Sequence, residues 1–153
     1  MSLKTSFQPI EWVDAMATGI ATIDRQHRFL IDTLQQANEK LLQDENDALL
    51  GEIAKVLLSY ALTHFETEEE LMQRYGYEAA CPEDAHAHVA QHRDFSRRVV
   101  ALRDQLREGR EVSRIEVLRF LNHWLRDHVL GIDRRLGEFL RQVMTEAGDK
   151  PGH

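Results

Sequence analysis

The sequence contains a single cysteine, Cys81, among its 153 residues. One thiol can form neither an intrachain disulfide nor a cysteine-rich metal site, and such low usage is typical of a reducing compartment. No apolar run approaches the roughly 20 residues that cross a bilayer. The first residues also lack the basic and then apolar pattern of a secretory signal. We therefore expect a cytoplasmic protein without a membrane span.

The sequence has no block of basic residues. Its 26 acidic and 19 basic side chains give a net charge of −7, which argues against nucleic acid or an anionic membrane as a partner. With 42% hydrophobic residues, the chain is long enough to bury one substantial core. We expect a single domain that is a monomer in solution.

Helical periodicity is the main positive signal. Apolar side chains recur at spacings of three and four along four segments, which short polar loops separate. The pattern predicts an all-α fold, an up-down-up-down antiparallel four-helix bundle over residues 20–146. The polar run 43–47 offers caps for the second helix, and Ser113-Arg114-Ile115-Glu116 matches a capping box that starts the fourth. We interpret residues 1–19 as an extended arm that packs on the bundle and residues 147–153 as a disordered tail.

Every predicted helix also carries inward-facing side chains of the metal-binding type. His64 and Glu68 form H-x-x-x-E, and His88 and His92 form H-x-x-x-H, so each pair lies on one helix face about one turn apart. Burying an unpaired ionised carboxylate costs on the order of several kcal/mol, so Glu68 must be protonated, paired or bound to a metal. The whole inward-facing set is His27, His64, Glu68, His88, His92, His128 and Asp133.

Taken singly, each of these histidines is more often a core or surface residue than a ligand, but the joint pattern favours a metal centre. Five imidazoles and two carboxylates exceed the four ligands of tetrahedral zinc and suit two metal ions bridged by the carboxylates. Nitrogen and oxygen donors without thiolate favour iron, although they also admit manganese and other first-row metals. His128 and Asp133 are five residues apart, which is about 140° on an ideal helix. We therefore predict a π-type bulge near Gly131 that brings both onto one face.

These motifs together resemble the hemerythrin family, in particular its single-domain bacterial members. The resemblance covers about residues 10–140. It includes Gly19-Ile20-Ala21-Thr22-Ile23-Asp24-Arg25-Gln26-His27, both paired motifs, and Trp124-Leu125-Arg126-Asp127-His128 running on to Asp133. What it implies is a non-haem di-iron centre that binds dioxygen reversibly.

The resemblance also implies a role for each residue of the set. One iron would be held by His88, His92 and His128. The other would be held by His27 and His64 and would keep an open position. The bridges would be Glu68, Asp133 and a solvent-derived oxo or hydroxo group.

The function that follows is dioxygen binding for storage, delivery or sensing, rather than enzymatic turnover. Such a site needs a dry apolar pocket, and Phe65, Trp124 and Leu125 are the candidates for its walls. One alternative keeps the site but makes the protein a di-iron oxidoreductase acting on peroxide, nitric oxide or another small oxidant. Another is a regulatory module that responds to iron or oxygen. A histidine-phosphotransfer bundle would instead need one exposed reactive histidine, whereas several histidines here face inward.

The remaining polar and aromatic residues receive simpler interpretations. Glu83 and His86 spell the E-x-x-H element of ferritin-like di-iron proteins, but that fold needs the element twice and it occurs once. We expect solvated side chains at His86, His123, His153, Glu66, Glu69 and Glu70. We expect core positions at Phe29, Phe95 and Phe139.

Overall fold

The structure, a computed structural model, describes residues 8–43 and 47–152. Within this part of the chain every regular element is helical. The elements are η2 (Asp14–Met16), α1 (Ala21–Gln43), α2 (Asp47–Tyr75), α3 (Tyr77–Ala80), α4 (Pro82–Arg107), α5 (Arg114–Leu130) and α6 (Ile132–Glu146).

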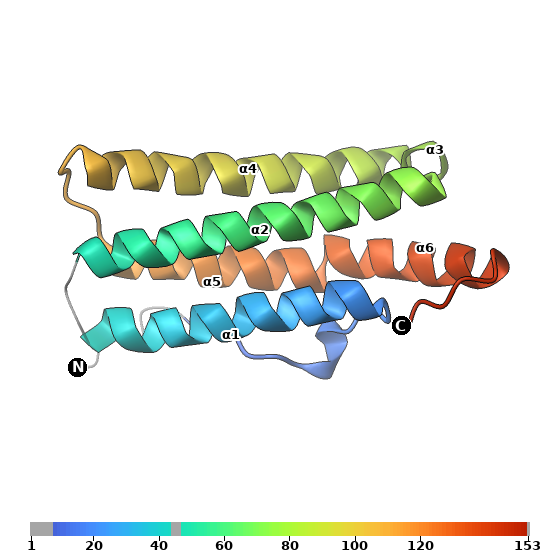
Figure 1. The fold of residues 1–153 in the computed structure, drawn as a ribbon, viewed down its shortest axis with the longest axis horizontal. Coiled ribbons are helices and arrows are strands. Elements are labelled where there is room, and N and C mark those ends of the chain that lie inside the picture. The colour runs from blue at the N-terminus through green and yellow to red at the C-terminus, as the bar shows by residue number, and fades with distance from the viewer. Residues whose placement is uncertain (1–7, 44–46, 153) are drawn as a thin grey trace.

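The long helices lie side by side, with α6 continuing the direction of α5 (Figure 1). The helices α1, α2, α4 and α5 alternate in direction. Helix α2 packs against α1 and α4, and α1 also packs against α5. The described residues therefore form one bundle, and its interior is where the inward-facing stripes of the sequence meet.

Local signals place the helix ends. The Ser113 hydroxyl accepts a hydrogen bond from the Glu116 backbone N–H at 3.3 Å, as the capping box predicted. Pro82 opens α4, where a missing N–H costs nothing. The predicted caps of α2 in residues 44–46 lie outside the described residues. The short helix α3 was not predicted, and it follows Gly76, which has a left-handed φ of 73°.

A break at Gly131 divides the predicted fourth helix into α5 and α6. The backbone there has φ −101° and ψ −89°, outside helical values. Gly131 N–H still donates to Asp127 O, and Arg135 N–H donates to Gly131 O, so the hydrogen bonds keep the spacing of four. The distortion is therefore a break at one residue and not the predicted π-type bulge. It lets side chains five residues apart, His128 and Asp133, point to the same interior.

Residues 8–19 cross the surface of α1 and α5. Ile10 is fully buried, and its N–H donates to the side-chain oxygen of Asn122 at 2.9 Å. Gln35 donates to Ile10 O, while the guanidinium of Arg28 lies 4.1 Å from the centre of the Trp12 ring. Residues 1–7 of the predicted arm lie outside the described residues.

The C-terminal segment makes specific contacts that contradict the expectation of a disordered tail. Ala21 N–H donates to Pro151 O at 2.8 Å, and the Tyr75 hydroxyl donates to Asp149 at 2.5 Å. These bonds satisfy the start of α1 and tie the segment to two helices. The expectation is thus revised for residues 147–152, and His153 lies outside the described residues.

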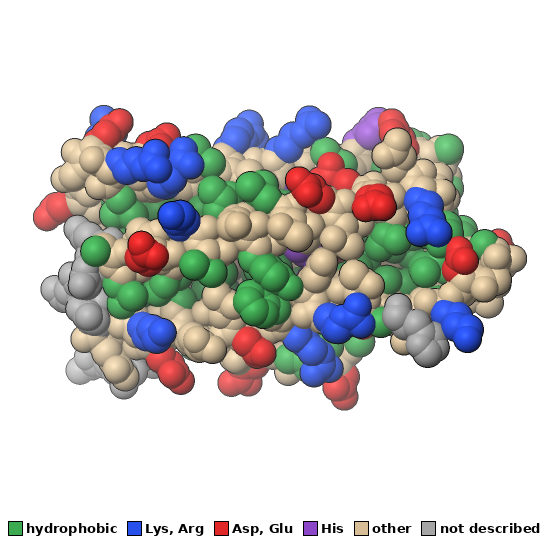
Figure 2. All heavy atoms as spheres, viewed as in Figure 1, with side chains coloured by type: hydrophobic (Ala, Val, Ile, Leu, Met, Phe, Trp, Pro, Cys, Tyr) green, Lys and Arg blue, Asp and Glu red, His purple; other side chains and the backbone are tan. Residues whose placement is uncertain are grey.

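Two surface features bear on the earlier expectations. Phe29, expected in the core, is 47% exposed and stacks on Tyr60 with ring centres 4.1 Å apart. Acidic and basic side chains are interspersed over the face drawn in Figure 2, without a large block of one sign.

Helix α2, over Ala48–Tyr75, is long and apolar enough to cross a membrane, a test that core helices of soluble proteins also pass. The side chains of His64 and Glu68 on this helix face the bundle interior.

Candidate metal centre

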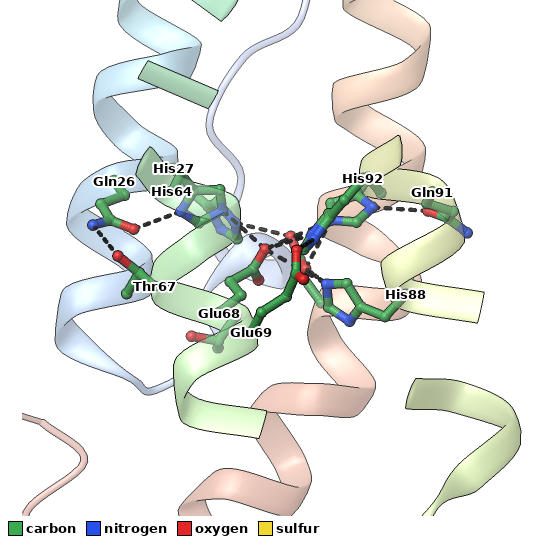
Figure 3. Close-up of polar contacts among 12 residues, drawn as sticks. Gln26, His27, His64, Thr67, Glu68, Glu69, His88, Gln91 and His92 are labelled. Carbon is green, nitrogen blue, oxygen red and sulfur yellow. Dashed lines mark hydrogen bonds and ion pairs between the residues drawn. The ribbon is translucent and has the colours of Figure 1, made fainter. Parts of the chain in front are cut away.

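All seven predicted metal-binding residues meet in the bundle interior, and none is more than 2% exposed. Helix α1 supplies one imidazole, α2 an imidazole and a carboxylate, α4 two imidazoles, and the break between α5 and α6 the last imidazole and carboxylate. Figure 3 shows the histidines of α1 and α2 on one side of the carboxylates and those of α4 on the other. The residues are His27, His64, Glu68, His88, His92, His128 and Asp133.

The ligand atoms fall into two groups, in each of which they lie within 4.8 Å of one another. The three-histidine group contains Glu68 with His88, His92 and His128. The two-histidine group contains Glu68 and Asp133 with His27 and His64. Both groups are buried throughout.

The two carboxylates connect the groups. Asp133 Oδ2 lies 2.8 Å from His27 Nε2, while its Oδ1 lies 2.9 Å from His88 Nε2 and 3.0 Å from His128 Nε2. Glu68 Oε1 lies 3.2 Å from His64 Nε2 and 3.1 Å from His92 Nε2. Each carboxylate therefore faces histidines of both groups.

The donor atoms fit metal binding better than hydrogen bonding. Bonds of roughly 2.0–2.2 Å to a first-row metal place neighbouring ligand atoms roughly 3 Å apart, which matches these separations. Buried polar atoms normally have hydrogen-bond partners. Among the described residues, none is found for Nε2 of four histidines, for Oε2 of Glu68 or for either oxygen of Asp133. A cluster of buried donors that converge without satisfying one another is suited to cations.

Without a metal ion, protons would balance the charge of the cluster. Burial acts to raise the pKa of Glu68, but the neighbouring imidazoles, with His64 foremost, hold it well below its ordinary value. Burial acts to lower the pKa of His88, yet the nearby Asp133 and Glu68 carboxylates raise it to about 10. The pKa of His128 is raised for the same reason, whereas burial lowers that of His92. Metal binding would therefore displace protons from imidazole nitrogens.

Three histidines are oriented by side chains that sequence reasoning had not assigned to the site (Figure 3). Each contact involves Nδ1, so that Nε2 is left to face the cluster. The pairs are His64 with Gln26 at 2.6 Å, His128 with Gln91 at 2.8 Å and His92 with Glu69 at 2.9 Å. Gln26 in turn donates to the Thr67 hydroxyl at 3.1 Å. Glu69 was expected to be merely solvated, and this contact corrects that expectation.

These partners could not be found from helical spacing, because each bonds to a histidine on another helix. Gln26 directly precedes His27 in the sequence but bonds to His64. Gln91 directly precedes His92 but bonds to His128. Only the packing of neighbouring helices brings the atoms together.

An apolar cavity of about 20 Å³ lies beside the cluster. On α2, Ala61 precedes His64 by three residues, and on α5, Leu125 precedes His128 by three, so the cavity lies about one helical turn from these two histidines. All three predicted pocket residues line it. The lining residues are Leu30, Leu34, Leu57, Ala61, Phe65, Phe95, Leu121, Trp124 and Leu125.

Two of these cavity residues also pack against histidine rings of the cluster. Phe65 stacks on His92 with ring centres 3.9 Å apart, and Trp124 stacks on His128 at 4.5 Å. A cavity of this volume holds about one water-sized molecule, and its apolar walls offer water no hydrogen bonds. The two other described histidines, His86 and His123, are exposed, as expected.

Known proteins give an independent comparison. The Hemerythrin HHE cation binding domain matches residues 18–140 of this chain. Bacteriohemerythrin of Pseudomonas aeruginosa (strain LESB58) is 31% identical over 135 residues, which cover 88% of this chain and 84% of that protein. Bacteriohemerythrin of Stenotrophomonas maltophilia (strain R551-3) is 32% identical with the same coverage.

The fold agrees with these sequence matches. A crystal structure of wild-type hemerythrin has a TM-score of 0.77 with this structure at 25% identity, covering 87% of this chain and 98% of that one. The resemblance inferred from the motifs is thereby confirmed, and the chain belongs to the hemerythrin family.

Proposed function

We propose that this protein binds dioxygen reversibly at a non-haem di-iron centre, for oxygen storage, delivery or sensing. An up-down-up-down antiparallel four-helix bundle with an N-terminal arm would hold the centre. The observation that carries the proposal is the unequal division of imidazoles between two buried groups that share their carboxylates. The relatives named bacteriohemerythrin support the same assignment.

The number of donors differs between the two proposed metal positions. The three-histidine group offers three imidazoles and one oxygen of Glu68, and Asp133 Oδ1 lies beside two of these imidazoles, which gives five donors in all. With a shared solvent atom, that position would be complete at six. The two-histidine group offers one imidazole fewer, so one position would stay open for dioxygen.

When bound, two iron ions would supply the electrons that dioxygen binding requires and take them back on release. The protein must keep water and protons away from the bound molecule. Phe65, Trp124 and Leu125 serve this purpose in our proposal, because they form apolar walls within one turn of the ligands. Packing of Phe65 and Trp124 against ligand rings also holds those rings in place.

We further propose that the protein is a monomeric, cytoplasmic binding protein and not an enzyme. A site rich in imidazole with one open position favours holding dioxygen.

The test is an optical one, on protein loaded with ferrous iron in the absence of air. We expect two irons per chain and a charge-transfer band that appears with dioxygen and fades when dioxygen is swept out. Immediate oxidation without a band or a return would contradict the proposal and favour the oxidoreductase alternative.

A further inference from the structure

Helix α2 gives the ligand His92 a charged partner, whereas two other ligand histidines have neutral partners. Glu69 Oε2 lies 2.9 Å from His92 Nδ1. The corresponding contacts of the other two are to amide oxygens, at 2.6 Å from Gln26 to His64 and 2.8 Å from Gln91 to His128. The three distances are similar, so the main difference among these contacts is the charge of the acceptor.

A carboxylate on the outer nitrogen changes how the ring acts on a metal. Glu69, as a carboxylate, accepts a hydrogen bond from Nδ1–H of His92 and so leaves the lone pair of Nε2 directed towards the cluster. A charge-assisted hydrogen bond is about twice as strong as a neutral one, and it makes the ligand more basic. The hydrogen bond between His92 and Glu69 strengthens further when the positive charge of a metal at Nε2 increases. The carboxylate thus favours the more highly charged state of the metal position over the less charged state.

The surroundings let this charge act through a fixed ring. Phe65 stacks on the His92 ring, and the Ser96 hydroxyl donates to the backbone oxygen of His92 at 3.0 Å. Glu69 itself is 41% exposed and lines a surface groove between α2 and α4. Arg93 and Arg97 line the same groove. Solvent and these cations screen part of the charge but leave the direct contact to His92 intact.

We propose that Glu69 is a positioning residue that, through His92, stabilises the oxidised state of the centre and thereby raises its dioxygen affinity. Dioxygen binding draws electrons from the metals, so a group that favours their higher charge favours the bound state. The statement on dioxygen rests on the proposed function. The statement on oxidation requires only that the site holds a redox-active metal pair.

The experiment measures the midpoint potential of the first reduction of the oxidised, iron-loaded protein, by spectroelectrochemistry without air. Glu69→Gln keeps an amide oxygen for His92, as two other ligand histidines already have, and removes the charge. We expect the ratio of oxidised to reduced protein at a fixed potential to fall about tenfold, which equals ~59 mV for one electron. The iron dissociation constant should rise by about tenfold or more. Dioxygen half-saturation should need a higher pressure.

Two further variants separate a charge effect from a structural one. Glu66→Gln removes the same charge from the same groove, one turn away on α2, without a bond to a ligand, and should leave the midpoint unchanged. Gln91→Glu places a carboxylate on His128 in the same three-histidine group, and should shift the midpoint in the opposite direction. Combined with Glu69→Gln, it should return the midpoint towards that of the wild-type protein.

An unchanged midpoint in Glu69→Gln with iron retained would overturn the proposal, as would an equal shift in Glu66→Gln. If Glu69→Gln loses its iron, Gln91→Glu decides, and an unshifted midpoint there would overturn it. A shifted midpoint in a protein that shows no reversible dioxygen band would uphold the role of Glu69 while contradicting the proposed function.

Discussion

The two halves of the centre are built differently. In the three-histidine group, His92 lies between a stacked Phe65 ring and Glu69, and His128 lies between a stacked Trp124 ring and Gln91. These rings are fixed both by packing and by a hydrogen bond. The two-histidine group is held more simply.

In that second group, His64 is oriented by Gln26, while Nδ1 of His27, like Nδ1 of His88 in the three-histidine group, is buried without a hydrogen-bond partner among the described residues. The two rings meet edge to face with centres 4.6 Å apart. Under the proposed function, the three-histidine group forms the complete metal position and the two-histidine group forms the position with fewer donors. Four predictions test this division.

Removing one of the two carboxylates that reach both groups should have the largest effect. Asp133→Ala takes away the oxygens that face His27, His88 and His128. Both positions lose a donor, and the remaining imidazoles lose their bridging anion, so we expect the loss of nearly all iron. Iron per chain after purification measures this. The control is Asp127→Ala, because Asp127 is exposed on α5; retention of two irons in Asp133→Ala would contradict the bridging role.

Removing one imidazole from the three-histidine group should cost roughly half of the iron. His128→Ala takes one donor from a position that has no spare ligand, while the two-histidine group keeps its full set. Iron analysis with ferrous loading gives the occupancy. His123→Ala, five residues earlier and exposed on the same helix, is the matched control. Full occupancy in His128→Ala would count against its assignment as a ligand.

Widening the apolar cavity should keep the metals and shorten the life of the dioxygen complex. Leu125→Ala opens the wall and admits water, so autoxidation should become severalfold faster. The substitution should also cost about 2–5 kcal/mol of unfolding free energy. Leu118→Ala removes the same volume from α5 at a fully buried position in another core cluster. Leu118→Ala should lower the unfolding free energy by a similar amount without changing autoxidation. Equal autoxidation rates in the two variants would contradict the pocket assignment.

The pH dependence of metal loading should show a smaller effect. The pKa of His88 is raised from 6.5 to about 10 by the Asp133 and Glu68 carboxylates, so the ring holds a proton at neutral pH when no metal is bound. The interaction of protonated His88 with these carboxylates stabilises the metal-free protein fully below about pH 6.5 and progressively less as the pH rises towards 10. Metal must displace the proton, so affinity should fall as the pH falls. Calorimetry of metal binding in two buffers of different ionisation heat should show release of at least about one proton per chain. Metal binding without proton release would contradict the prediction.

The sequence was sufficient for the set of inward-facing residues because helical periodicity fixes which face each side chain occupies. His64 and Glu68, four residues apart, must share a face on any regular helix. The same reasoning located a distortion at Gly131 but not its form, since a bulge and a break both satisfy a spacing of five. Phe29 lies about 120° from the centre of the inward-facing stripe of α1, so its exposure agrees with helical periodicity, and the expectation of a core position did not follow from it.

Contacts between helices could not be derived in this way. The Gln26, Gln91 and Glu69 contacts depend on the relative height of adjacent helices, which no single helix encodes. The buried amide pair of Asn38 and Asn122 is of the same kind, with both hydrogen bonds at 2.8 Å across 84 residues of sequence. Such contacts are set by side-chain packing along the whole bundle.

Anomalous diffraction at the iron absorption edge, from crystals of protein loaded with ferrous iron, tests the central claim most directly. The account predicts two iron positions per chain. One should be bonded to His88, His92 and His128, the other to His27 and His64, with Glu68 and Asp133 touching both. A single iron, or two irons with the same number of imidazole ligands, would contradict it.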